Sequence, residues 1–258
     1  MLRHRDIAAF TETLAPPRGG DEGFRFGDSR AETTGVLVCF MATLEAIGEA
    51  AAKGCNLVLA HEELHYPYSA FPGPALEESI TWTTNRLRYA ALAQHGLAVY
   101  RAHGQADRFC ILESFAEKLG LPAPSVREGY YRIYDIEPVT VGELARDVKE
   151  RVGQPHLRVS GALGKVVRRV GAPWGGLGLS LNVGFIEALL DHGPDVLIAG
   201  ECDEYAFRYT EDAGVPMIET GHSISENPGL ERLAQVLQDQ FPQVPVVFHA
   251  VPCPWQTV

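Results

Sequence analysis

The sequence predicts an α/β protein with a largely parallel sheet and helices packed on it, and two observations carry this prediction. Short runs of β-branched and other apolar residues recur along the whole chain. Stretches with helical periodicity separate these runs, as expected for strands that are joined by crossover helices. We therefore expect strands over residues 35–40, 56–60, 97–101, 195–199, 215–219 and 244–250, with additional strands at 130–134 and 157–160.

Helices are expected at 6–14, 44–53, 140–153 and 228–241. Gly54 follows the second of them, at a position where a left-handed cap favours glycine. Thr140 and Glu143 form the T-x-x-E pattern of a capping box at the start of the third. The fourth begins at Pro228 and carries four apolar residues at helical spacing, which we assign to the core: Leu230, Leu233, Leu237 and Phe241.

A faint internal repeat predicts two lobes. Segment 53–62 reads KGCNLVLAHE and segment 192–201 reads HGPDVLIAGE, so that Glu62 aligns with Glu201. Each segment is followed by a helical stretch and then by a second strand that leads to His103 or His222. A duplicated β-α-β unit explains this pattern most simply, and chance similarity between two buried strands is the alternative. We expect the first lobe at 1–121 and the second at 122–258.

Composition excludes several classes of protein. The 258 residues carry 22 Lys+Arg against 33 Asp+Glu, a net charge of −11, so the protein lacks the basic surface that nucleic-acid binding requires. No apolar run approaches the roughly 20 residues that span a membrane. Asp6 and Glu12 also interrupt the position of a signal peptide, so we expect a cytoplasmic protein. The five cysteines are odd in number and form no C-x-x-C pair, which argues against disulfides and cysteine zinc sites.

Histidine and carboxylate side chains follow four of the predicted strands. Because ligands bind at the carboxyl ends of parallel strands, we expect these groups to meet at one edge of the sheet. Imidazole and carboxylate together bind Zn, Mn, Fe or Mg, and enough groups are present for up to two ions with a bridging carboxylate. The candidates are His61, Glu62, Glu63, His65, His103, Asp107, Glu201, His222 and Glu226.

Each candidate also has a simpler explanation. A single histidine after a strand is more often a loop residue than a ligand. Asp107 has the sequence position of a helix N-cap, and Glu226 precedes Pro228, where a negative charge favours a helix N-terminus. The glycine-rich segment at 175–178 matches no phosphate-binding motif, and we expect a flexible loop near the site. The chain contains no G-x-S-x-G motif of an α/β serine hydrolase.

Four segments together resemble the Nif-three-like family, whose members are also described as GTP cyclohydrolase I type 2 homologues. They are LVLAHE at 57–62, AHGQAD at 102–107, DVLIAGE at 195–201 and ETGHSISE at 219–226. The resemblance implies two intertwined α/β lobes, a toroidal homohexamer and two metal ions per chain.

By position, the resemblance implies His61, Asp107, His222 and Glu226 as metal ligands. Where the family usually has a second adjacent histidine, this chain has Glu62, so either Glu62 ligates or His65 replaces it. A carboxylate there favours Mn, Mg or Fe relative to Zn.

Two functions follow from these observations. The first is a metal-dependent hydrolase, of cyclohydrolase or phosphoesterase type, that acts on a small molecule through a metal-activated water. In it, His103 and Glu201 are expected to transfer protons. The second is a non-catalytic metal-binding regulatory or interaction protein that uses the same ligands. A plain α/β fold without metal is the third alternative.

Overall fold

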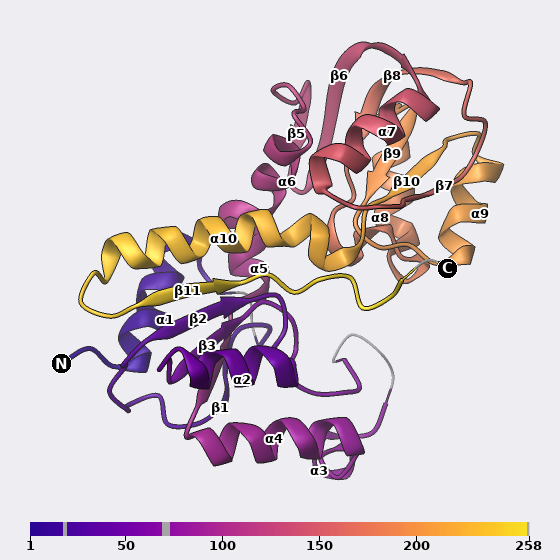
Figure 1. Ribbon diagram of the computed structural model, residues 1–258. Helices are drawn as coiled ribbons and strands as arrows, with labels where there is room; N and C mark the ends of the chain where they lie inside the picture. Colours follow the sequence, from indigo (N-terminus) through magenta and orange to yellow (C-terminus); the bar gives the residue numbers. More distant parts are fainter. Residues whose placement is uncertain (18–19, 69–72, 257) are drawn as a thin grey trace. The chain divides into compact units, whose positions relative to one another are not determined.

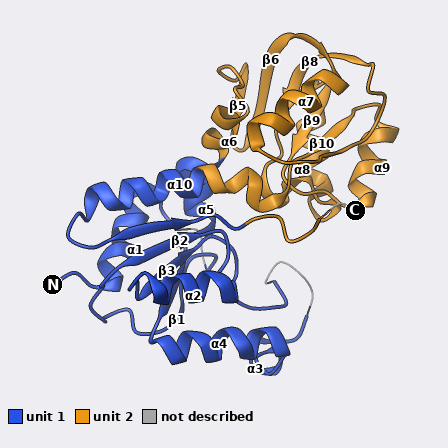
Figure 2. Cartoon of the chain, in the orientation of Figure 1, with its two compact units in different colours: residues 1–111, 229–251 blue, residues 112–228, 252–258 orange. Residues whose placement is uncertain are grey.

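The computed structural model describes residues 1–17, 20–68, 73–256 and 258. The chain divides into two compact units, shown in Figure 2: unit 1 comprises 1–111 and 229–251, and unit 2 comprises 112–228 and 252–258. The sequence placed all of 122–258 in the second lobe. In the structure, the segment 229–251 instead returns to unit 1, where its strand joins the first sheet.

Unit 1 is built on a five-stranded sheet with the order β1-β4-β3-β2-β11. Figure 1 labels β1, β2, β3 and β11 of this sheet. The strands β4, β3, β2 and β11 are parallel, and β1 pairs antiparallel with β4. The elements of unit 1 are α1 (His4–Leu14), β1 (Gly23–Phe26), β2 (Val36–Cys39), α2 (Leu44–Ala52), β3 (Leu57–Ala60), α3 (Leu76–Ser79), α4 (Thr83–His95), β4 (Ala98–Arg101), α5 (His103–Ala106), the π-helical turn η1 (Asp107–Ile111) and β11 (Val246–His249).

The local sequence explains these elements well. Every residue of β2 and β3 is buried, which accounts for their uninterrupted apolar runs. Thr43 caps α2 by accepting a hydrogen bond from the Ala46 N–H at 3.1 Å. Gly54 follows this helix with φ +70°, so the predicted glycine stop is confirmed. Ile47 of α2 and Leu92 of α4 belong to the same core cluster as strand residues such as Val58, so these helices cover one face of the sheet.

Unit 2 is built on a six-stranded mixed sheet with the order β5-β6-β8-β9-β10-β7. Strands β8, β9 and β10 are parallel, and the other pairs are antiparallel. Its elements are α6 (Leu112–Lys118), β5 (Val126–Glu128), β6 (Tyr131–Thr140), α7 (Val141–Val152), β7 (Arg158–Val159), β8 (Val166–Gly171), the 3-10 turns η2 (Gly175–Gly178) and η3 (Ser180–Asn182), α8 (Val183–Leu190), β9 (Val196–Ala199), α9 (Glu204–Asp212), β10 (Met217–Glu219) and the start of α10 (His222–Gln240).

The two sheets share a core arrangement that the sequence repeat predicts. In each unit, three parallel strands are neighbours in chain order, β2-β3-β4 and β8-β9-β10, and an antiparallel strand flanks the third. The expectation of one sheet edge that carries all four polar strand ends is wrong, because β3 and β4 lie in one sheet and β9 and β10 in the other. The mixed α/β fold class is confirmed.

The predicted start of α7 is confirmed, and the predicted start of α10 is wrong. The capping box of α7 is present, because Thr140 Oγ1 accepts from the Glu143 N–H and the Glu143 carboxylate accepts from the Thr140 N–H. The last long helix was expected to begin at Pro228, but α10 begins at His222 and contains this proline. The hydrogen bond from the Ser225 N–H to Gly221 O, at 3.0 Å, belongs to this earlier turn. Proline lacks the N–H donor and its ring crowds the carbonyl four residues earlier, so α10 passes through Pro228 without that one backbone hydrogen bond.

The leucines of α10 pack as predicted, since Leu230, Leu233 and Leu237 are at most 1% exposed. Among the described residues, no helix has the length and apolar content needed to cross a membrane.

Candidate metal centre

His61 and Glu62 directly follow β3, and both side chains are buried in unit 1. Their backbone N–H groups continue the pairing with the neighbouring strand, donating to Cys39 O at 3.1 Å and Phe40 O at 2.7 Å. His61 Nδ1 lies 3.4 Å from Ala102 O, and its Nε2 lies 3.8 Å from Asp107 Oδ1. The carbonyl and the carboxylate therefore fix the imidazole with Nε2 directed toward Asp107.

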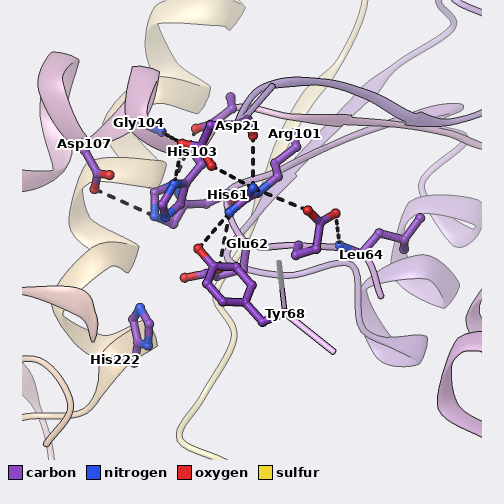
Figure 3. Close-up of polar contacts among 12 residues, drawn as sticks. Asp21, His61, Glu62, Leu64, Tyr68, Arg101, His103, Gly104, Asp107 and His222 are labelled. Atoms are coloured by element: carbon purple, nitrogen blue, oxygen red, sulfur yellow. Dashed lines mark hydrogen bonds and ion pairs between the residues drawn. The ribbon is translucent and has the colours of Figure 1, made fainter. Parts of the chain in front are cut away.

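His103 and Asp107 come from the helical segment that follows β4, where α5 runs directly into the π-helical turn η1. Residues four apart lie on the same face of a helix, so both side chains point the same way. The imidazole rings of His61 and His103 have centroids 4.7 Å apart. Figure 3 shows His61, His103 and Asp107 grouped together, and one ligand atom from each lies within 4.8 Å of the others.

This group fits a divalent metal ion by its donor chemistry. Two imidazoles and one carboxylate are ligands that Zn, Mn and Fe share. The side chains of His103 and Asp107 are 23% and 14% exposed, so the group is accessible from solvent while His61 is fully enclosed. Asp107 is not the N-cap that its sequence position suggested, because the chain is already helical at His103.

Asp21 orients His103. The His103 Nδ1 lies 2.8 Å from Asp21 Oδ2, which leaves Nε2 for the ligand group. A carboxylate in this position selects one tautomer and holds the ring of a metal-binding histidine. Burial raises the pKa of the Asp21 carboxyl, but the hydrogen bond and charge of His103 and the charge of Arg101 outweigh it and hold that pKa well below its usual value.

Arg101, the last residue of β4, is the centre of the polar network beneath the ligand group. It is 1% exposed, and its guanidinium lies 2.8 Å from Asp21 Oδ1, 3.4 Å from Glu63 Oε2 and 3.9 Å from Glu62 Oε2. Its Nη2 also donates to the Tyr68 hydroxyl at 3.0 Å (Figure 3). Arg101 was not among the residues predicted from the sequence, although it is a charged residue that ends the apolar run LAVYR.

His65, the alternative to Glu62 as a ligand, turns toward a different carboxylate. Its Nδ1 lies 3.7 Å from Glu63 Oε1. Burial lowers the pKa of the His65 imidazole, and the charge of Glu63 opposes this effect. The unit 1 group of His61, His103 and Asp107 does not include it.

Unit 2 holds its own histidine and carboxylate group at the start of α10. His222 Nδ1 lies 3.0 Å from Glu201 Oε2, and its Nε2 lies 3.2 Å from Glu226 Oε1. Glu226 is 2% exposed and sits one helical turn after His222. It is an interior helix residue, so its interpretation as a charge before a helix start is wrong.

The glycine-rich segment packs against this second group. A Cβ built on Gly175 would lie 2.0 Å from Glu226 Oε1, and one on Gly176 would lie 3.2 Å from His222 Cε1. Gly175 also has φ +53°, which side chains rarely tolerate. The segment predicted as a loop near the site, residues 175–178, forms a 3-10 turn beside His222 and Glu226, where glycine permits the close approach.

Comparisons with known proteins agree with this architecture. The family model for Duf34/NIF3 (NGG1p interacting factor 3) matches residues 2–254. This chain belongs to the Duf34/NIF3 family. A "GTP cyclohydrolase 1 type 2 homolog" from Nostoc sp. is 30% identical over 222 residues, which cover 80% of this chain and 78% of the relative. The family that the four sequence segments resemble is thereby confirmed.

Solved structures share the fold across the whole chain. A hypothetical protein of Staphylococcus aureus, SA1388, superposes with a TM-score of 0.80 at 18% identity and covers 100% of this chain and 99% of its own. A Bacillus cereus protein related to NIF3 gives a TM-score of 0.79 at 16% identity, with 99% of each chain covered. Within the Duf34/NIF3 fold, unit 1 supplies His61, Glu62, His65, His103 and Asp107, and unit 2 supplies Glu201, His222 and Glu226.

Proposed function

We propose that this chain binds a divalent metal ion through His61, His103 and Asp107 and acts as a metal-dependent hydrolase on a small-molecule substrate. The observation that carries the proposal is the convergence of two imidazole nitrogens and a carboxylate oxygen within 4.8 Å of one another, from two different strand ends. Membership in the Duf34/NIF3 family supports it, because relatives are named GTP cyclohydrolase 1 type 2 homologues.

The protein residues around the group have distinct roles in this proposal. A divalent ion held there supplies a Lewis acid that lowers the pKa of water and polarises a carbonyl or phosphoryl oxygen. Ala102 O and Asp21 orient the two imidazoles through their Nδ1 atoms. Asp107 contributes the negative charge of the group. His103, which was expected from the sequence to transfer protons, is a ligand in this proposal.

Unit 2 contributes two further candidates. The family resemblance implies His222 and Glu226 as ligands, and the contact between them leaves both side chains on one face of α10. Glu201, the second group assigned to proton transfer, instead holds His222 Nδ1 at 3.0 Å and acts as a positioning residue in this proposal.

Metal content tests the proposal directly. Chelator-treated protein is incubated with Mn, Fe or Zn, freed of excess ion, and its metal per chain is measured by plasma mass spectrometry. We expect His61→Ala and Asp107→Ala to lose metal. His95→Ala serves as the matched control, because His95 is an exposed histidine at the end of α4. No bound metal in the wild type would overturn the proposal.

Turnover separates the hydrolase from the regulatory alternative. Phosphoesters, nucleotides and cyclic amides are screened with and without Mn and Zn. Metal-dependent hydrolysis that Asp107→Ala abolishes supports the enzyme, and metal binding without turnover of any substrate class favours the regulatory protein.

The proposal includes the oligomeric state of the chain and its cellular compartment. The resemblance to the family supports a homohexamer, which light scattering of the purified chain tests. The five cysteines are free thiols, four of them buried, which suits a reducing compartment and a cytoplasmic protein.

A further inference from the structure

Arg101 is a cation fixed inside unit 1, among the carboxylates next to the ligand group. Its guanidinium contacts Asp21, Glu63 and Glu62 at 2.8, 3.4 and 3.9 Å. With its side chain 1% exposed, the guanidinium has little water around it. A guanidinium stays protonated in proteins, so unit 1 carries a permanent positive charge at this position.

Several contacts hold this charge in place. The Arg101 Nε donates to His61 O at 3.3 Å, at the strand end that carries both His61 and Glu62. Its Nη2 donates to the Tyr68 hydroxyl at 3.0 Å, and its Nη1 donates to Asp21 O at 3.0 Å. The guanidinium has little freedom to withdraw when an ion approaches Glu62.

Glu62 stands where the family resemblance implies an imidazole for a second metal ion. Its carboxylate lies within 4.8 Å of a ring nitrogen of His61, and it also lies 3.9 Å from Arg101 Nη2. The repeat gives an internal comparison, because Glu201 aligns with Glu62 and also engages a basic side chain from the next strand end, His222 Nδ1 at 3.0 Å. The glutamate after the middle parallel strand therefore pairs with Arg101 in unit 1 and orients His222 in unit 2.

We propose that Arg101 takes the place of a second metal ion, so that this chain holds one divalent ion and Glu62 pairs with the guanidinium in place of acting as a ligand. The proposal rests on the metal binding proposed above. Two like charges repel strongly where water is excluded, so a fixed guanidinium disfavours a dication at the same carboxylate. A second guanidinium adds positive charge among these carboxylates, since Arg25 Nε lies 3.1 Å from Glu63 Oε1.

Manganese loading tests the stoichiometry without any substrate. Metal-free full-length protein is saturated with Mn²⁺, freed of excess ion, and measured by plasma mass spectrometry and electron paramagnetic resonance. We expect one manganese per chain and the resolved hyperfine pattern of an isolated ion. Two manganese per chain with the spectrum of a spin-coupled pair would overturn this inference and leave the proposed metal binding intact. No bound manganese would overturn the proposed metal binding itself.

Variants test the roles of the two side chains. Glu62→Gln keeps the shape of the side chain and should leave the count at one, whereas a fall in bound metal would show that Glu62 is a ligand and overturn the inference. Arg101→Ala should raise the count to two, because Glu62, Glu63 and Asp21 then lack their common cation. A folded Arg101→Ala protein that still binds one ion would also overturn it.

Controls separate charge from folding. Arg101→Lys retains the positive charge and should hold one ion. Arg88→Ala removes another buried arginine of unit 1, one that donates to Leu64 O at 2.8 Å, and should leave the count unchanged. If Arg101→Ala does not fold, the wild-type stoichiometry and Glu62→Gln decide the question.

Discussion

The third parallel strand of each unit ends in a charged residue, but the sign of the charge is opposite in the two units. In unit 1, β4 ends at Arg101, which pairs with Asp21 just before the antiparallel strand β1. In unit 2, β10 ends at Glu219, which accepts hydrogen bonds from Arg158 of the antiparallel strand β7. The same arrangement of strands therefore holds an ion pair of reversed polarity.

This reversal explains why two aligned glutamates differ in role. Arg101 provides a positive charge next to Glu62, which is 6% exposed. Glu219 provides a negative charge next to the segment that carries Glu201, and the Glu201 side chain is 46% exposed and turns to His222 instead. A duplicated backbone thus yields a charge-compensated carboxylate in one unit and a histidine-orienting carboxylate in the other.

The largest expected effect comes from removing the cation of unit 1. Arg101→Met should lower the free energy of unfolding by about 3–5 kcal/mol, because it removes the buried cation that Asp21, Glu62 and Glu63 share. Arg158→Met should cost only about 1–2 kcal/mol, because the Arg158 side chain is 53% exposed and water reaches its position. Urea denaturation of the metal-free variants measures both, and equal losses would contradict the contrast in burial.

The glycine-rich turn of unit 2 gives the next largest effect. Gly175→Ala should destabilise the protein by about 1–3 kcal/mol more than the backbone strain alone, because the new methyl group overlaps Glu226. Gly193→Ala is the matched control, since Gly193 has φ +69° and nothing within 4 Å of the added Cβ. It should show only the strain, about 1–2 kcal/mol. Thermal unfolding compares them, and similar losses would mean that Glu226 yields freely.

Local features of the sequence predicted local structure. The apolar runs before His61 and Glu201 predicted buried strands, because burial on both faces requires no polar residue at any position. The T-x-x-E pattern predicted α7, because Thr140 and Glu143 complete each other's hydrogen bonds within one turn.

Long-range partners were not predictable in the same way. Asp21 lies 80 residues from Arg101 in sequence and belongs to a segment with no recognisable pattern, so neither the orienting role of Asp21 nor the Arg101 network was foreseen. The start of α10 was missed because Pro228 is a strong local signal that the contacts of His222 and Ser225 override. Which strands share a sheet depends on pairing between distant segments, which periodicity does not record.

Asp21 and Glu201 each hold the Nδ1 atom of a histidine, at 2.8 Å in unit 1 and 3.0 Å in unit 2. Asp21→Asn should weaken manganese binding by about 10–100-fold, because it removes the group that fixes the His103 tautomer. Glu201→Gln should weaken it by less than about tenfold, because Glu201 orients His222 of unit 2, which is outside the group of His61, His103 and Asp107. Competition with a fluorescent chelator measures both dissociation constants. An unchanged constant in Asp21→Asn would remove His103 from the proposed ligand group.

The smallest expected effect concerns the stability that the two aligned glutamates provide. Glu62→Gln should lower the free energy of unfolding by about 1–2 kcal/mol, because a buried charged partner of Arg101 becomes neutral. Glu201→Gln should change it by less than about 0.5 kcal/mol, because half of that side chain is already in water. Urea denaturation without metal resolves the difference. If both variants lose the same stability, Arg101 does not stabilise the charge of Glu62. The opposite charges at the ends of β4 and β10 would then have no effect on the stability that Glu62 and Glu201 provide.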